Sequence, residues 1–153
     1  MSEGNWADIA GRLGEDVRGK FHRLPVRVYF EDTDAGGVVY HASYVRFCER
    51  GRTDFLRLLG VEARQLISGE ASNEPAAFVV RRMSLDFKRP GRMDDLLVVE
   101  TRVKELGGAS VTLSQDISKD GRSIFEAEVT VVLVSVGGKP LRLSDAIRVA
   151  FEG

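Results

Sequence analysis

Residues 31–44, with the sequence EDTDAGGVVYHASY, bring together three carboxylates, two glycines, one histidine and two tyrosines. The glycine pair allows a sharp turn that brings backbone N–H groups close to a ligand. Asp34 can present its carboxylate to a carbonyl carbon, as a general base or as a nucleophile. A carboxylate is a weak base in water, so this chemistry suits a thioester, whose thiol leaves readily. The alternative is an ordinary turn, in which Asp32 and Asp34 cap the backbone and His41 packs at a helix start.

The elements on either side of this loop are a predicted strand and a predicted helix. Apolar and polar residues alternate over residues 24–31, as in a strand with one buried face. From Tyr40 to Leu59 apolar residues recur every three or four positions, and Gly60 ends the pattern, which predicts a long amphipathic helix. Gly51 lies on the apolar stripe, where a missing side chain would let the helix approach a sheet. The unpaired amides at the helix start, near His41, suit an oxyanion formed in acyl transfer.

The rest of the chain is predicted to be mainly β-structure. Residues 61–68 favour a short helix, and four β-rich segments follow at residues 75–90, 94–108, 109–122 and 123–139. The Asp120-Gly121 pair predicts a hairpin turn, and the apolar segment 130–136 predicts a central strand covered on both faces. Ser144 or Asp145 would cap a final short helix. The sequence thus predicts an α+β fold with one long helix against a five-stranded antiparallel sheet.

Residues 1–22 are predicted to form an N-terminal extension before a single domain at residues 23–153. Apolar residues from Trp6 to Phe21 have helical spacing, but Gly11, Gly14 and Gly19 each cost about 1 kcal/mol in a helix interior. The extension is therefore expected to be a marginal amphipathic helix or disordered.

Composition excludes several classes of function. A net charge of −1 over 153 residues gives no reason to expect nucleic-acid binding. Neither a membrane-spanning run nor a secretory signal is visible, so a cytoplasmic protein is expected. Cys48, the only cysteine, lies on the apolar stripe and is predicted to be a buried packing thiol. With two unpaired histidines, no metal site is expected, and His22 is predicted to be exposed.

A basic cluster follows the first of the four β-rich segments. It consists of Arg81, Arg82, Lys88, Arg89 and Arg92. Such a cluster could bind the phosphates of a coenzyme A ester, with Arg89 and Arg92 as the main contacts. The alternative is a solvated strand end.

Residues 29–60, YFEDTDAGGVVYHASYVRFCERGRTDFLRLLG, resemble the signature of the Tol-Pal-associated acyl-CoA thioesterases. These belong to the hotdog-fold superfamily of 4-hydroxybenzoyl-CoA thioesterase, in which a long central helix is wrapped by an antiparallel sheet. The resemblance extends over residues 26–151 and implies an acyl-CoA thioesterase without a cofactor. It implies that Asp34 is the catalytic carboxylate and that the backbone N–H at His41 polarises the thioester carbonyl. The positions expected to shape the substrate site are Tyr29, Gly37, Tyr40, Tyr44 and Glu49.

A single helix leaves apolar surface on the sheet uncovered, so a homo-oligomer is expected, and the resemblance favours a dimer of dimers. Acyl-CoA is the predicted substrate, with acyl carrier protein as an alternative carrier and cell-envelope proteins as peripheral partners. Two other functions remain open. One is a hotdog dehydratase, which would use a histidine as acid and base; the other is a non-enzymatic acyl-CoA or carrier-protein binding scaffold.

Overall fold

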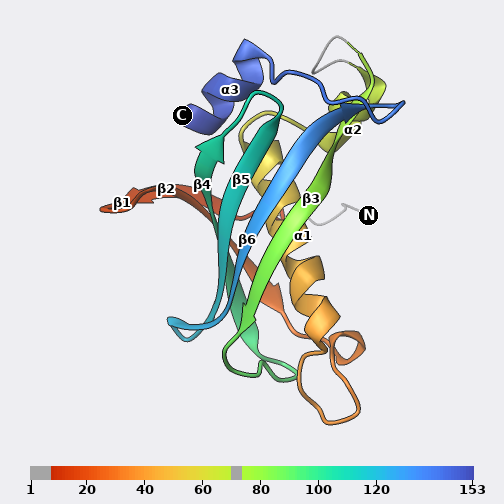
Figure 1. Cartoon of the computed structure of the whole chain (residues 1–153). Helices are drawn as coiled ribbons and strands as arrows, with labels where there is room; N and C mark the ends of the chain where they lie inside the picture. The colour runs from red at the N-terminus through yellow and green to blue at the C-terminus, as the bar shows by residue number, and fades with distance from the viewer. Residues whose placement is uncertain (1–7, 70–73) are drawn as a thin grey trace, which may run out of the picture.

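The computed structural model describes residues 8–69 and 74–153, which form one antiparallel sheet and three α-helices (Figure 1). The strands are β1 (Arg12–Asp16), β2 (Gly19–Arg27), β3 (Ala76–Phe87), β4 (Leu96–Leu106), β5 (Ser110–Lys119) and β6 (Arg122–Ser135). The helices are α1 (His41–Leu58), α2 (Ala63–Ser68) and α3 (Asp145–Glu152), and a short 3-10 turn, η1, covers Phe30–Asp32. The strand order is β1-β2-β4-β5-β6-β3, so β1 and β3 lie at the two edges.

The long helix α1 runs along one face of the curved sheet, as predicted (Figure 1). Phe47, Cys48 and Phe55 on its apolar stripe are buried. At Gly51 an added Cβ would lie 2.9 Å from a methyl group of Val99, closer than real Cβ atoms come. The glycine therefore allows the helix to lie directly on β4, which confirms the expected close approach.

The predicted helix in the N-terminal extension is wrong over the described residues. Residues 12–16 form β1 and pair with the first half of β2, and this hairpin adds a sixth strand to the five expected. Gly14 has the ring of Phe21 against it, where a Cβ would come within 2.4 Å, and Gly19 has φ of +108° in the turn. The glycines that disfavour a helix are thus the residues that a tight hairpin needs. Trp6 lies outside the described residues.

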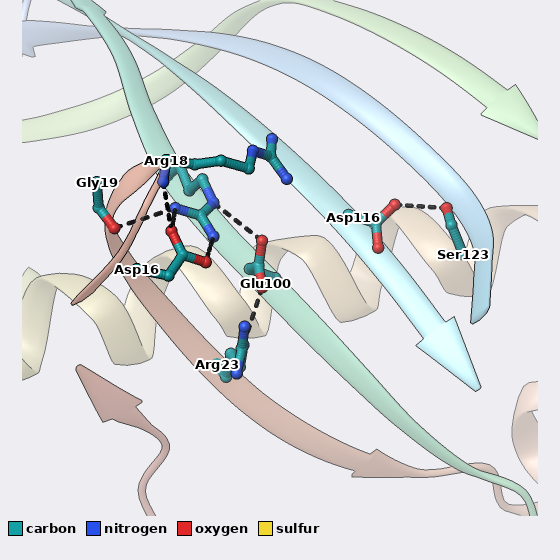
Figure 2. Close-up of polar contacts among 8 residues, drawn as sticks. Asp16, Arg18, Gly19, Arg23, Glu100, Asp116 and Ser123 are labelled. Carbon is teal, nitrogen blue, oxygen red and sulfur yellow. Dashed lines mark hydrogen bonds and ion pairs between the residues drawn. The ribbon is translucent and has the colours of Figure 1, made fainter. Parts of the chain in front are cut away.

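An ion-pair network ties the turn of the β1–β2 hairpin to strand β4 (Figure 2). Arg102 on β4 donates to both carboxylate oxygens of Asp16, at 3.0 and 2.6 Å, and to Glu100 at 2.9 Å. Arg23 on β2 donates to the same Glu100 at 2.8 Å. A two-pronged guanidinium–carboxylate contact fixes direction as well as distance, so the turn of the hairpin is tied to β4.

Most of the remaining predictions of secondary structure are confirmed. The short helix α2 is present, Asp120 and Gly121 have φ of +50° and +77° in the β5–β6 turn, and Ser144 caps α3 by accepting from the Ile147 amide. Segment 130–136 is not covered on both faces: β6 alternates buried and half-buried residues, and Val136 is exposed. Among the described residues, no helix has the length and apolar character needed to cross a bilayer.

The strand predicted over residues 24–31 ends early, at Arg27. The chain then turns into η1, which leaves Phe30 81% exposed although its place in the alternation predicted a buried side chain. His22 is also different from the prediction, because its side chain is completely buried between β2 and α1.

Candidate active site

The loop between η1 and α1 is a compact turn closed by its own backbone. Thr33 forms an isolated β-bridge with Val39, and the Asp34 amide donates to the Val38 carbonyl at 2.8 Å. The Gly37 amide donates back to the Asp34 carbonyl at 3.1 Å, with Gly37 at φ of +80°. A positive φ is easily adopted only by glycine, so the sequence fixes the tip of this turn.

The Asp34 side chain is exposed at this turn and is held by one of its two oxygens. Oδ1 accepts from the Gly36 amide at 2.8 Å and from the Val38 amide at a longer 3.4 Å. Oδ2 takes part in no hydrogen bond within the part of the chain that the structure describes. The carboxylate is therefore oriented by the loop and keeps one oxygen free for a ligand.

Asp32 caps the backbone of the turn, the role that the alternative interpretation gave to both Asp32 and Asp34. It is buried, and its Oδ2 accepts from the Tyr29 amide at 2.8 Å. Its carbonyl accepts from the Tyr40 amide at 2.8 Å and from the Ser43 hydroxyl at 3.0 Å. These bonds attach the first turn of α1 to the loop.

The N-terminus of α1 carries free backbone N–H groups beside that loop. Tyr40 is the N-cap residue and makes no side-chain capping bond, and the first turn contains no acidic residue. The amides of His41 and Ala42 have no acceptor among the described residues. The His41 ring is exposed and lies against Tyr40 and Phe87, with ring centroids 4.4 and 6.4 Å away. An uncapped helix start is a favourable place for developing negative charge.

Tyr44 is buried in the core behind the loop and is not accessible to a ligand. Its ring is buried and stacks on Phe125 with centroids 5.0 Å apart, and its hydroxyl accepts from the Gly91 amide at 2.9 Å. Burial raises the pKa of the Tyr44 hydroxyl. The Gly91 carbonyl in turn accepts from the Val39 amide at 2.8 Å, so Tyr44 positions the loop through Gly91.

Tyr29 and Glu49 lie together, but in a neighbouring hollow. This hollow, of about 530 Å³, lies between β2 and α1, and neither Asp34 nor His41 lines it. Tyr40, half exposed, contacts the His41 ring instead. The predicted substrate residues therefore form two groups, one at the loop and one along α1.

The predicted phosphate-binding arginines follow β3, in the connection to β4. The Arg92 backbone forms a β-bridge with Val38, which places it beside the loop. The Arg89 guanidinium donates to the Ser123 carbonyl at 2.7 Å. Lys88 pairs with Glu126 at 2.7 Å, so part of the basic charge is already neutralised.

Cys48 is not a candidate nucleophile, as predicted. It is fully buried, and burial raises the pKa of its thiol to about 12. Because the thiolate is the reactive form, this thiol is inert near neutral pH. The described residues also contain no cluster of three or more histidine, cysteine or acidic side chains that could hold a metal ion.

Comparison with known proteins identifies the family. The model of the thioesterase superfamily matches residues 36–132, which include part of the loop, α1 and most of the sheet. The chain belongs to this superfamily. It is 44% identical over 132 residues to the acyl-CoA thioester hydrolase YbgC of Escherichia coli, covering 85% of this chain and 95% of that protein.

Two further relatives agree. The acyl-CoA thioesterase YbgC of Haemophilus influenzae is 41% identical over 130 residues, covering 84% of this chain and 93% of that protein. Among solved structures, a probable thioesterase from Bartonella henselae has a TM-score of 0.79 at 44% identity and covers 81% of this chain and 99% of its own. The predicted hotdog fold is confirmed, and the chain is an acyl-CoA thioesterase, an enzyme that hydrolyses the thioester bond.

Proposed function

We propose that the loop between η1 and α1 is the active site of this acyl-CoA thioesterase, with Asp34 as its catalytic carboxylate. The observation that carries the proposal is the free Oδ2 of Asp34 next to a helix start without a cap. Oδ2 either attacks the thioester carbonyl, forming a mixed anhydride, or removes a proton from an attacking water. In both routes the thiolate of coenzyme A leaves and water supplies the new carboxylate oxygen.

The oxyanion of the tetrahedral intermediate is stabilised by backbone amides at the start of α1. The His41 amide is the principal donor, and the positive end of the helix dipole adds to its effect. The imidazole ring is not needed for this role, because its contacts are with Tyr40 and Phe87. Its function is to pack the helix start against the end of β3.

A pair of variants separates the His41 amide from the ring. His41 is the first residue of α1, where proline is well tolerated, and Tyr40 has φ of −63° and ψ of 135°, which suits a residue before proline. His41→Pro removes the N–H and should lower kcat by about two to three decades, as for other single oxyanion donors. His41→Ala removes the ring but keeps the N–H and should cost about one decade. Equal losses from both variants, with the fold intact by circular dichroism, would contradict the amide role.

Substrate contacts are proposed in two places, at the loop and in the neighbouring hollow between β2 and α1. We propose that Gly37, Tyr29, Tyr40 and Glu49 shape the acyl site, and that Arg89 and Arg92 contact the phosphates of coenzyme A. A thioesterase from Thermus thermophilus, 30% identical with a TM-score of 0.68, was solved in complex with coenzyme A and Zn. Acyl carrier protein is proposed as a second carrier, on the 28% identity to the acyl-acyl carrier protein thioesterase ATL3 of Arabidopsis thaliana. Thiol release measured in parallel from both carriers decides between them.

The exposed edge of β3 supports a homo-oligomer. β3 pairs only with β6 among the described strands and leaves Val79, Val80, Leu85 and Phe87 each more than a third exposed. A free edge of this length with apolar side chains is a natural site for pairing with a second copy. We propose a dimer formed along β3 and a dimer of dimers as the complete enzyme. Val79→Lys with Leu85→Lys should give an inactive monomer in sedimentation, whereas a stable and fully active wild-type monomer would contradict the proposal.

We also propose a cellular setting for the enzyme. The resemblance of residues 29–60 to Tol-Pal-associated thioesterases supports a cytoplasmic enzyme with peripheral contacts to cell-envelope proteins. Co-purification of Tol-Pal components with the tagged chain, compared with the β3-edge variant, tests this association.

A further inference from the structure

One short turn contacts the proposed active-site loop on both of its sides. This turn, residues 92–95, lies between β3 and β4, at the same end of the molecule as the loop (Figure 1). On the side where the chain enters the loop, the backbone of Val28 exchanges two hydrogen bonds with the turn, both of 2.9 Å. On the side where the chain leaves the loop, Val38 forms a β-bridge with Arg92. The turn therefore holds both ends of the segment that carries Asp34.

The backbone of this turn has a conformation that its sequence does not favour on its own. The Asp95 amide donates to the Arg92 carbonyl at 3.1 Å, and Asp94 between them has φ of +71°. A positive φ is disfavoured for residues other than glycine, although aspartate tolerates it better than most. A further contact that closes the turn is therefore important for keeping it in one conformation.

The side chain of Asp95 supplies that contact. Its Oδ2 accepts from the Arg92 amide at 2.8 Å, and its Oδ1 forms an ion pair with Lys119 of β5 at 2.9 Å. The Asp95 side chain is only 15% exposed. Burial raises the pKa of Asp95, but the hydrogen bonds from Lys119 and from the Arg92 amide outweigh this effect and hold the pKa below its ordinary value. Asp95 therefore stays ionised near neutral pH and ties the turn to the end of β5.

The contacts of Asp95 reach the Asp34 carboxylate through the main chain. The Arg92 amide that Asp95 accepts from belongs to the residue that bridges Val38. The Val38 amide donates to Asp34 Oδ1 at 3.4 Å, and the Val38 carbonyl accepts from the Asp34 amide at 2.8 Å. A displaced turn therefore displaces the backbone that orients Asp34. A shift of about 1 Å in a reacting group can cost about 100-fold in rate.

We propose that Asp95 is a positioning residue for the thioesterase reaction, which sets the place of the Asp34 loop and does not touch the substrate. This inference rests on the proposed function, because it assumes that Asp34 performs the chemistry. Asp95 acts on kcat, through the alignment of the Asp34 carboxylate with the thioester carbonyl. A contact that only stabilised the fold would change the free energy of unfolding and leave the turnover of the folded enzyme as it is.

The test measures kcat per folded enzyme after removal of the Asp95 carboxylate. Asp95→Ala should lower kcat about 30-fold, equivalent to about 2 kcal/mol at 1.36 kcal/mol per decade. The loss is partial because the bond between the Tyr44 hydroxyl and the Gly91 amide still supports the neighbouring backbone. Asp95→Asn keeps an oxygen for the Arg92 amide and loses the ion pair, so its kcat should fall by only about three- to tenfold.

Asp16 in the N-terminal hairpin provides a matched control. It is also a carboxylate next to a turn that accepts from a backbone amide, that of Arg18 at 2.9 Å, and pairs with a cation, Arg102, at 2.6 Å. Asp16→Ala should keep kcat per folded enzyme within about twofold of wild type, because the hairpin lies outside the loop and its supports. An equal fall in kcat from Asp16→Ala and Asp95→Ala would mean that both act by general destabilisation, and would overturn the inference.

A double-mutant cycle separates this inference from the function on which it rests. Added to Asp34→Asn, Asp95→Ala should lower kcat by less than about threefold more, because the group that it positions is already gone. A further fall of about 30-fold would show that Asp95 acts independently of Asp34. Wild-type turnover in Asp95→Ala would overturn the positioning role and leave the proposed function intact, whereas near-normal turnover in Asp34→Asn alone would overturn both. Asp95→Asn carries the same cycle if the alanine variant folds poorly.

Discussion

Two aspartates of this chain, Asp34 and Asp54, use the same functional group in opposite ways. Asp54 on α1 is buried, and its oxygens accept from His22 at 2.6 Å, from the Gly11 amide at 2.8 Å and from Arg57 at 2.9 Å. Asp34 is exposed and accepts two amide bonds at one oxygen only. The comparison teaches that a carboxylate with both oxygens bonded holds elements together, whereas one with an oxygen free of bonds is available for chemistry.

The largest expected effect comes from Asp34→Asn, which keeps the shape of the side chain and removes the charge. We expect kcat to fall by about three decades, or about 4 kcal/mol of transition-state stabilisation at 1.36 kcal/mol per decade. The unfolding free energy should change by less than about 0.5 kcal/mol, because the residue is exposed. Thiol-release kinetics and urea unfolding of the same preparation give both values. Near-normal turnover would show that Asp34 is not catalytic and that the loop is an ordinary turn.

Asp54→Asn should show the opposite pattern. Replacing this buried carboxylate costs about 2 kcal/mol, because the buried His22 N–H and the Gly11 amide lose a charged acceptor. Its kcat per folded enzyme should stay within about threefold of wild type, since the hydrogen-bond partners of Asp54 are His22, Gly11 and Arg57, none of which belongs to the loop of Asp34. Urea unfolding at one fixed protein concentration measures the loss. An unchanged urea midpoint, or a loss of turnover as large as that of Asp34→Asn, would contradict the assignment of a structural role to Asp54.

His22, the partner of Asp54, should make stability depend on pH. Burial lowers the pKa of His22 below 6.5, while the charge and hydrogen bond of Asp54 oppose this shift. Its Nδ1 has no hydrogen-bond partner among the residues that the structure describes, so protonation would add a buried N–H without an acceptor there. Below pH 6.5 the unfolded chain therefore binds the proton more readily than the folded one, and stability is lost as the pH falls from 6.5 towards the folded-state pKa.

The pH test has a matched control in the same chain. His22→Gln should flatten the pH dependence of the melting temperature below pH 6.5. His41→Gln changes the only other histidine, which is exposed, and should leave that dependence as in wild type. A wild-type melting temperature that rises on acidification through this range would show that His22 is stabilised in its protonated form.

The smallest expected effect concerns the exposed arginines beside the loop. Exposed charge contacts are screened by salt, so KM for acyl-CoA should rise with ionic strength while kcat changes less. Arg89→Ala with Arg92→Ala should raise KM by less than about tenfold and flatten this salt response. Arg12→Ala, in the N-terminal hairpin, is the control and should keep the wild-type response. A double variant with an unaltered salt response would make the cluster a solvated surface.

Whether the sequence could predict the surroundings of Asp34 and Asp54 depends on how far along the chain their hydrogen-bond partners lie. The partners of Asp34 lie two and four residues away, within a turn whose glycines are visible in the sequence, so its exposure and orientation could be anticipated. Asp54 contacts His22 across 32 positions and Gly11 across 43. No local pattern encodes such pairs, which is why His22 was predicted to be exposed.

The N-terminal hairpin shows a similar limit. Apolar residues from Ile9 to Phe21 fit the period of a helix, and only the glycines opposed that prediction. The strand β1 is stabilised by pairing with β2 and by the Arg102–Asp16 contact, which spans 86 positions. Long-range pairing outweighs local spacing here, because the helix would have three glycines in its interior.

The central claim is that Asp34 acts on the bound thioester and is not needed to bind it. Titration of an intact acyl-CoA into Asp34→Asn by isothermal calorimetry tests this directly. We predict that the variant binds acyl-CoA with a dissociation constant close to the one that the wild-type enzyme shows for a non-hydrolysable thioether analogue. The thioester should be recovered unhydrolysed after the titration. The reason is that the deleted interaction matters mainly in the transition state. Absence of binding, or release of the thiol during the titration, would contradict the account.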